Sequence, residues 1–553
     1  MGLALAAALA AARVAWQLIR PDDLFLDSWV LVHILEVFNG EVSPLPRATL
    51  TLQYPLSYLP FVIPARVIGA LDTVKFVYPV VSSLAAIPAY MLARRGIAPL
   101  AGALALLFVP DELVKALNGT PQGIAFVLFL FAVYFSIRRN RAAFTVTAIA
   151  TLLTHHLTGL AVLLLYYSVW VLPRTREPGF LRQEWPYLLL FSVWPLYWAL
   201  TFAVTNQWYL APIFLGLVAV VGAPLAAGLY ILLPAIRRAI RFTGALAAGL
   251  SARRVVTIAA LVAATAWLAS ASLVDTPGLS SAEAANRMVA ALYMGAVSVG
   301  FFALLSRRDE GLTIFVLAAG VFVTLILALG CRAFFDSLRL LDYILIVALT
   351  ALFAPGLEGR WVSRGVLITA AVAVVLAGSI RLAFNYERLF AYTPGQVAAA
   401  EWIRANTKPS EAVATDTKMS LLILGRAGRH ATFEGTWWLF EAAAIGPYIT
   451  ALNNAERFRE RPITYVLMAD YMIEQGAEVA WFTPLARASA SSMASIESIG
   501  TAVYDQAGVK IWKISEKLAR TPPALSAADF SGPLGVSCGR GLDGLMLRLW
   551  GQP

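Results

Sequence analysis

The residues best suited to chemistry in this sequence are acidic, and they gather at the ends of long apolar runs. They are Asp22, Asp23, Asp27, Asp111, Glu112 and Glu283. Carboxylates from several loops at one depth can bind a hard divalent cation through oxygen, and one of them can serve as a base. We therefore expect a site with a carboxylate base and with Mg²⁺ or Mn²⁺ as the candidate cofactor. For any one acid, helix capping or solvation in a loop is the alternative.

An arginine and a second acid stand where another apolar run begins, in the segment Arg339-Leu340-Leu341-Asp342-Tyr343. A planar guanidinium near the membrane surface is suited to hold a phosphate that arrives on a lipid. The alternative is an interfacial arginine that extends to lipid headgroups. We expect Arg339 and Asp342 to bind substrate.

Histidines and tryptophans add further candidates for substrate binding. His155 and His156 are adjacent, between two apolar runs, and there are four histidines in the chain. Neighbours on a helix point about 100° apart, so both would not easily ligate one ion, but one could contact a phosphate or a carboxylate. Packing at a helix end is the alternative. Trp437 and Trp438 could stack on sugar rings or anchor the chain at the membrane, and His33 is interpreted as a local hydrogen-bonding residue.

The composition is that of a protein embedded in a lipid bilayer. Of 553 residues, 59% are hydrophobic and 14% charged, with a mean hydropathy of +0.72, whereas soluble domains are about 25% charged. The net charge of +10 comes from arginines in short clusters between apolar runs, a pattern that argues against nucleic-acid binding. Two cysteines exclude a disulfide framework and a cysteine-based metal site.

Apolar runs of about 20 residues match the thickness of a bilayer, and they predict an α-helical polytopic membrane protein with about thirteen transmembrane helices. The predicted spans are 2–19, 76–93, 97–110, 122–137, 142–154, 157–172, 186–204, 209–234, 255–273, 288–305, 311–330, 341–356 and 365–381. We interpret the first as a span rather than a cleaved signal peptide. The loops alternate between basic and acidic, so the positive-inside rule predicts a multi-pass protein of the cell membrane with a cytoplasmic N-terminus.

Three regions are expected along the chain. Residues 1–385 form the transmembrane domain, and its long first external loop, 20–75, holds short helices lying at the interface. In residues 386–518 charges return and apolar runs shorten. We expect a small extracytoplasmic α/β domain there, with strands near 412–415, 465–468 and 509–514. The tail 519–553 has no predicted role.

The first external loop resembles that of the GT-C superfamily of membrane glycosyltransferases. The resemblance lies in Asp27-Ser28-Trp29, His33, Asn39-Gly40 and the segment Gln53 to Tyr58, which includes Tyr54. These polytopic enzymes take sugars from polyprenyl phosphates or pyrophosphates. The resemblance implies that Asp27 is the base or a metal ligand, that Asp111-Glu112 and Glu283 form further acidic motifs, and that Arg339 contacts the lipid phosphate.

The overall layout is similar to that of oligosaccharyltransferases, with one departure. Those enzymes carry a W-W-D-Y-G motif soon after the first helix of the external domain, whereas this chain has Thr415-Asp416-Thr417-Lys418-Met419 there. Trp437-Trp438 come later and are followed by Leu-Phe. We therefore expect an acceptor other than a peptide sequon.

These observations together predict an inverting glycosyltransferase acting at the external membrane face. It would move a sugar from a polyprenyl-phosphate-linked donor to a glycan, lipid or protein acceptor, with Asp27, or its neighbours Asp22 and Asp23, as the base. The alternatives are a transporter or lipid flippase without glycosyl transfer, and a scaffold that anchors the external domain. Transporters usually carry charges near the bilayer midplane and internal repeats. Here the charges are expected at span ends, and no repeat is evident.

Overall fold

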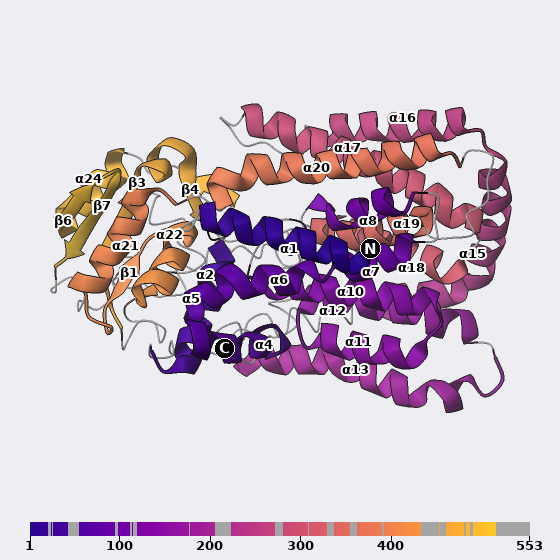
Figure 1. Ribbon diagram of the computed structural model, residues 1–553, viewed down its shortest axis with the longest axis horizontal. Coiled ribbons are helices and arrows are strands. Elements are labelled where there is room, and N and C mark those ends of the chain that lie inside the picture. Colours follow the sequence, from indigo (N-terminus) through magenta and orange to yellow (C-terminus); the bar gives the residue numbers. More distant parts are fainter. Residues whose placement is uncertain are drawn as a thin grey trace.

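The computed structural model places a helical bundle beside a smaller domain built on a β-sheet (Figure 1). Helices prevail because a backbone in apolar surroundings has to satisfy its own hydrogen bonds. The structure describes residues 1–19, 24, 26–41, 55–94, 98–110, 113, 119–175, 177–204, 223–270, 280–307, 309–328, 337–353, 362–389, 392–432, 449, 453, 461–479, 483–486 and 490–515.

The bundle is formed by the described helices between Gly2 and Leu389. In chain order they are α1 (Gly2–Ile19), α2 (Leu26–Asn39), α4 (Pro55–Ile68), α5 (Ala70–Asp72), the π-helix η1 (Thr73–Val77), α6 (Tyr78–Ser83), α7 (Ala86–Ala93), α8 (Pro99–Leu107), α10 (Pro121–Ile137), α11 (Arg141–Leu152), α12 (His156–Tyr166), η2 (Tyr167–Val171), η3 (Leu172–Arg174), α13 (Phe180–Val204), α15 (Ala223–Gly249), α16 (Ala252–Ser270), α17 (Ser280–Arg307), α18 (Glu310–Ala328), α19 (Ser337–Phe353) and α20 (Arg364–Leu389).

Several of these helices are long and apolar enough to cross a membrane. Within the described residues five meet that test: Gly2–Ile19, Ala70–Ala93, His156–Arg174, Arg287–Arg307 and Arg364–Ala383. Other predicted spans are occupied by shorter apolar helices, such as α10 and α11. The coarse expectation of a helical membrane protein is therefore supported, and the count of thirteen spans stays a prediction.

One predicted span, 209–234, is described only over residues 223–234, and its crossing of a membrane stays a prediction. These residues begin α15, which extends beyond the predicted end, through Arg237 and Arg241, to Gly249. Figure 1 shows this helix running across the end of the bundle that lies away from the sheet, and the chain bends by 115° between it and α16. A helix with arginines along its polar side is better placed at a water boundary than across hydrocarbon.

The basic loops that were predicted to share one membrane face do lie together. Arg237 of α15 forms an ion pair with Glu310 and donates to the carbonyl of Pro173 at 2.7 Å. Arg174, next to that proline, pairs with Glu184 at 2.8 Å, and Glu184 also pairs with Arg141. Loops far apart in the sequence thus meet at one end of the bundle. Which side of a membrane this end faces stays a prediction.

The C-terminal domain is the small α/β domain that the sequence predicts. Its sheet has the order β2-β1-β3-β7-β6, with β1 parallel to β2 and β3, and β7 antiparallel to β3 and β6. The elements are α21 (Pro394–Asn406), β1 (Ala412–Ala414), α22 (Thr417–Leu422), the π-helix η5 (Ile423–Ala427), β2 (His430–Ala431), β3 (Ile463–Ala469), η7 (Met472–Gly476), β4 (Ala477–Val479), β5 (Thr483–Ala486), α24 (Ala490–Ile499), β6 (Gly500–Gln506) and β7 (Val509–Ile514). The three predicted strands correspond to β1, β3 and β7.

Helices of the predicted first loop share the hydrophobic core of this domain. Trp29, Leu35 and Phe61 belong to the same buried cluster as Met419 and Ile511. The expected short helices in the loop are therefore present. The apolar residues of α2 pack against the C-terminal domain, and its expected position at the membrane interface stays a prediction. Burial of that surface fixes α2 to the sheet domain.

Candidate functional site

The helix α2 is the element around which the candidate site is built. It lies against η5 and α22 of the C-terminal domain, where Gly425 comes close to Trp29. A Cβ added at Gly425 would stand 2.6 Å from the Trp29 carbonyl oxygen, so only glycine allows the two elements to approach this closely. The Trp29 side chain is 2% exposed and packs edge-on to Tyr392, with ring centroids 6.3 Å apart.

The start of α2 is fixed to the segment that precedes α10. The backbone N–H of Gly119 donates to the Ser28 hydroxyl oxygen at 2.9 Å, and the Tyr78 hydroxyl donates to the carbonyl of Thr120 at 3.0 Å. Asp27 is the second residue of α2, so its backbone is held beside Gly119. The structure thus brings the backbone of the predicted base close to Gly119.

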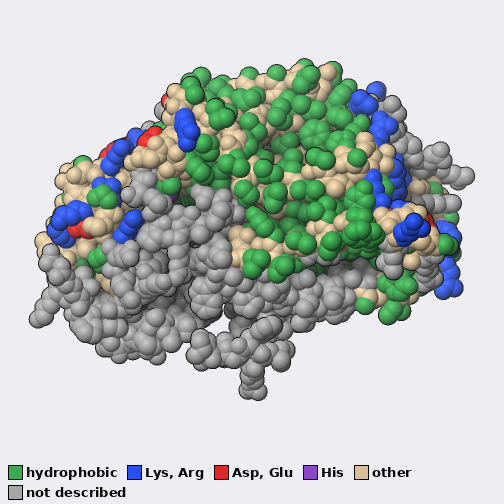
Figure 2. Space-filling model, turned by 90° about the horizontal axis from the view of Figure 1, so that it is seen from below, with side chains coloured by type: hydrophobic (Ala, Val, Ile, Leu, Met, Phe, Trp, Pro, Cys, Tyr) green, Lys and Arg blue, Asp and Glu red, His purple; other side chains and the backbone are tan. Residues whose placement is uncertain are grey.

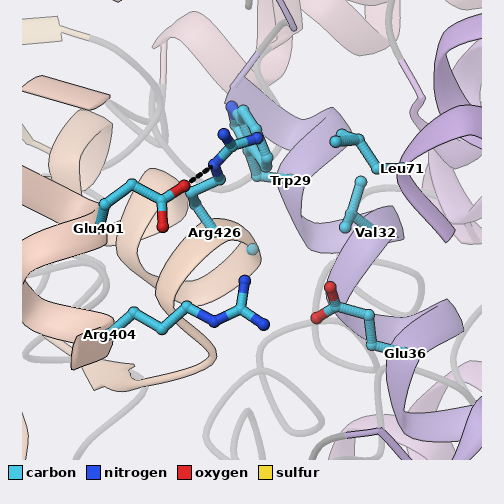
Figure 3. A pocket seen from close by; sticks show the side chains of 8 residues that line it. Trp29, Val32, Glu36, Leu71, Glu401, Arg404 and Arg426 are labelled. Atoms are coloured by element: carbon cyan, nitrogen blue, oxygen red, sulfur yellow. Dashed lines mark hydrogen bonds and ion pairs between the residues drawn. The ribbon is translucent and has the colours of Figure 1, made fainter. Parts of the chain in front are cut away.

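A cleft of about 240 Å³ opens between α2 and the C-terminal domain. Its walls are Trp29, Val32, Glu36 and Leu71 on the bundle side, and Glu401, Arg404, Gly425 and Arg426 on the side of the C-terminal domain. Figure 3 shows the four charged side chains directed into this space from both sides. The cleft has no signal in the sequence, because its two sides lie more than 300 residues apart in the chain and no local pattern joins them.

The charges in the cleft are only partly paired. Arg426 Nε lies 2.6 Å from Glu401 Oε1, an ion pair within the C-terminal domain. Arg404 extends toward Glu36 from the opposite side (Figure 3), and no ion pair joins them. Burial raises the pKa of Glu36 to about 7, with Glu41 adding to the shift and Arg404 opposing it. The Glu36 carboxyl can therefore exchange a proton near neutral pH.

His33 lies in the same helix as Glu36, and its surroundings differ from the expectation. The side chain is 4% exposed, and neither ring nitrogen has a hydrogen-bond partner among the described residues. The interpretation as a local hydrogen-bonding residue is therefore not supported. Burial lowers the pKa of His33 to about 4, with Arg461 adding to the shift, so the ring is neutral at physiological pH.

The stretch that replaces the oligosaccharyltransferase motif forms a buried polar cluster. Asp416 caps α22 by accepting from the Met419 N–H at 2.9 Å, and its second oxygen accepts from the Tyr471 hydroxyl at 2.5 Å. Lys418 is buried, with its ammonium 5.4 Å from the centre of the Tyr392 ring and 5.2 Å from that of Tyr471. These contacts join the stretch to the tyrosine that packs on Trp29.

The adjacent histidines have described roles in packing at a helix end. His155 has extended backbone and caps α12, accepting from the Thr158 N–H at 3.3 Å. The expected divergence of about 100° therefore does not apply, and the two rings lie 4.8 Å apart. The Thr158 hydroxyl bonds to that of Tyr343 at 2.6 Å. Asp342, the neighbour of Tyr343, is 2% exposed. The start of α12 and the first turns of α19 thus form one buried polar layer.

Most other predicted site residues lie outside the described part of the chain. Asp27, Glu283 and Arg339 fall within α2, α17 and α19, but their side chains are not described. Asp22, Asp23, Tyr54, Asp111, Glu112, Trp437, Trp438 and both cysteines fall on residues that the structure does not describe. No group of three or more histidines, cysteines or acids that could hold a metal ion occurs among the described side chains. The divalent cation stays a prediction.

A buried arginine within α1 contradicts the expectation that charges sit only at span ends. Arg13 is 6% exposed and donates to the hydroxyls of Ser82 at 2.8 Å and Ser83 at 3.2 Å. Two hydroxyls solvate a guanidinium without neutralising it, and an ionisable group at membrane depth is a functional candidate by default. The signal was present in the sequence as a single charge inside an apolar run.

Comparison with known proteins adds no family to these observations. A scan against protein-family models gives no match, and a search of curated proteins gives none either.

Proposed function

We propose that the chain is a membrane glycosyltransferase of the GT-C type, which takes a sugar from a polyprenyl-phosphate-linked donor. The observation that carries the proposal is the placement of α2. This helix holds Asp27 in its first turn, contacts the segment before α10 through Ser28, and packs against the C-terminal domain through Trp29. An acid at such a junction of bundle and domain is suited to act on a substrate that reaches it from the lipid.

In the proposed reaction an acceptor hydroxyl attacks the anomeric carbon from the face opposite the lipid phosphate. The bond between that carbon and the phosphate oxygen breaks, and polyprenyl phosphate leaves with the electron pair. Asp27 takes the hydroxyl proton, and Arg339 stabilises the charge on the departing phosphate. The configuration at the anomeric carbon inverts. The C-terminal domain would select the acceptor.

The test is transfer by the full chain in lipid nanodiscs, supplied with polyprenyl-phosphate and polyprenyl-pyrophosphate sugars and with glycan, lipid and protein acceptors. We expect Asp27→Asn to lower the rate by about 10²–10⁴-fold, the usual contribution of a general base. Asp505→Asn, at an exposed aspartate of β6, is the matched control. Unchanged transfer in Asp27→Asn would reject Asp27 as the base. Absence of transfer from every donor, together with movement of these lipids across vesicles, would favour a flippase.

A further inference from the structure

The cleft between α2 and the C-terminal domain has the properties of a binding site rather than of a packing defect. It is lined by two glutamates and two arginines, with an indole at its wall. Buried clefts at domain interfaces that combine apolar walls with a few directed polar groups are the usual places for small ligands. The volume of about 240 Å³ lies below the roughly 300–1,000 Å³ of drug-sized sites, which suits a ligand of about one ring.

The cleft contains polar groups that the described protein leaves without partners. The indole N–H of Trp29 is buried and has no acceptor among the described residues. Glu36 and Arg404 face each other across the cleft, and within the described part of the chain neither side chain has an ion pair or a hydrogen bond (Figure 3). Opposed charged side chains that line a cleft and bond to no described protein group are available to a ligand or to water that enters it.

The balance of charge selects the class of ligand. Two carboxylates oppose a phosphate or a carboxylate, and two guanidinium groups oppose a cation, so neither kind of ion is favoured. A hydroxyl both donates and accepts, so it can bond to Glu36 or Glu401 and to Arg404 alike. A compound with several hydroxyls on one ring can meet all of these groups together.

We propose that this cleft binds a neutral sugar ring. The ring spans the space between α2 and α21, with hydroxyls bonded to Glu36 and Arg404. Binding at the cleft does not depend on transferase activity. That the bound ring is part of the acceptor rests on the proposed function, since the cleft begins at Trp29, two residues from Asp27.

The experiment titrates the full chain in detergent with glucose, galactose, mannose and N-acetylglucosamine. Saturation-transfer NMR and calorimetry detect the binding. Inorganic phosphate, glucuronate and glucosamine are the charged comparators. We expect saturable binding of a neutral sugar, weakened about tenfold or more (~1.4 kcal/mol) in Arg404→Ala and in Glu36→Ala. Arg66→Ala and Glu474→Ala change exposed residues that do not line the cleft, and they should bind as the wild type does.

Three results would overturn the proposal: no saturable binding of any neutral sugar, equal binding by the cleft variants and the wild type, or preference for a charged comparator. Arg404 is exposed and Glu36 half-buried, so both alanine variants should fold, which thermal unfolding checks. Failure here is distinct from failure of the transferase proposal. A chain that binds no sugar can still transfer in an Asp27-dependent way, and a chain without transfer can still bind sugar.

Discussion

The Ser28 hydroxyl accepts a hydrogen bond from the backbone N–H of Gly119 at 2.9 Å, and this bond joins the first turn of α2 to the residue before the α10 cap. Gly119 allows the contact because a Cβ there would lie 3.2 Å from the Ser28 Cα and 3.1 Å from the Leu31 side chain. Asp27 precedes Ser28, so its position depends on this bond.

We predict that Ser28→Ala destabilises the protein by about 1–3 kcal/mol, because the buried N–H of Gly119 would lose its acceptor. Thermal unfolding in detergent measures the loss. Ser498→Ala is the control, since that hydroxyl is exposed and donates to the carbonyl of Ser495, and its effect should stay within about 0.5 kcal/mol. Equal stability of the two variants would show that the bond does not hold α2 in place.

Gly425→Ala should separate α2 from the C-terminal domain. The added methyl would meet the backbone and ring of Trp29 at 2.6–2.8 Å, and overpacking of this kind costs about 1–3 kcal/mol. We expect faster proteolysis between the domains and a lower unfolding temperature. Gly228→Ala adds the same methyl in α15, where nothing lies within 4 Å. Because alanine favours a helix over glycine, this control should lower neither the unfolding temperature nor the resistance to proteolysis. Unaltered proteolysis of Gly425→Ala would mean that the contact is loose.

The sequence predicted the helical bundle and the sheet domain because hydrophobic runs and buried strands are local signals. The strand Val509–Ile514 was predicted at its exact limits. Local patterns in the sequence did not predict that α2 packs into the C-terminal core or that Glu36 faces Arg404, since both depend on contacts between distant parts of the chain. The extent of α15 was missed for a related reason: its apolar residues resemble a span until the arginines at 237–241 are placed at the end of the bundle.

Acid should destabilise the protein through His33. The folded state holds the pKa of this ring at about 4, whereas the unfolded chain takes up the proton near 6.5. Stability from His33 is therefore present above pH 6.5 and is lost as pH falls toward about 4, by roughly 3 kcal/mol. Comparison of unfolding temperatures between wild type and His33→Leu across this range measures it. A parallel pH dependence in both proteins would contradict the prediction.

Glu36 should make the folded protein less stable as pH rises, which is the opposite of the pH dependence expected from His33. Its pKa is raised to about 7 in the folded state and lies near 4.3 in an unfolded chain, so ionisation opposes folding. The stability that Glu36 contributes is therefore complete below pH 4.3 and is lost as pH rises through about 7. Glu36→Gln should remove this loss and flatten the profile on the neutral side. A profile for Glu36→Gln that coincides with that of the wild type between pH 5 and pH 8 would contradict it.

The ion-pair cluster at the far end of the bundle should contribute more to stability than its surface neighbours. Glu184 is fully buried between Arg141 and Arg174 and accepts from the Tyr166 hydroxyl at 3.2 Å. Glu184→Gln keeps the shape and removes the charge, which leaves Arg141 without a counter-ion among the described residues. Loss of one partner of a buried pair costs roughly 3–5 kcal/mol, and partial exposure of both arginines places the expected loss at the lower end.

Glu177→Gln is the matched control for this cluster, because Glu177 pairs with the same Arg174 at 2.9 Å but is 53% exposed. Water competes for an exposed pair, so its loss should cost less than about 1 kcal/mol. Chemical unfolding of both variants in the same detergent compares them directly. If Glu184→Gln unfolds at a lower denaturant concentration while Glu177→Gln unfolds with the wild type, the stability of this end of the bundle depends on Glu184. Coincident curves for the two variants would mean that burial gives Glu184 no added role in joining α11, η3 and α13.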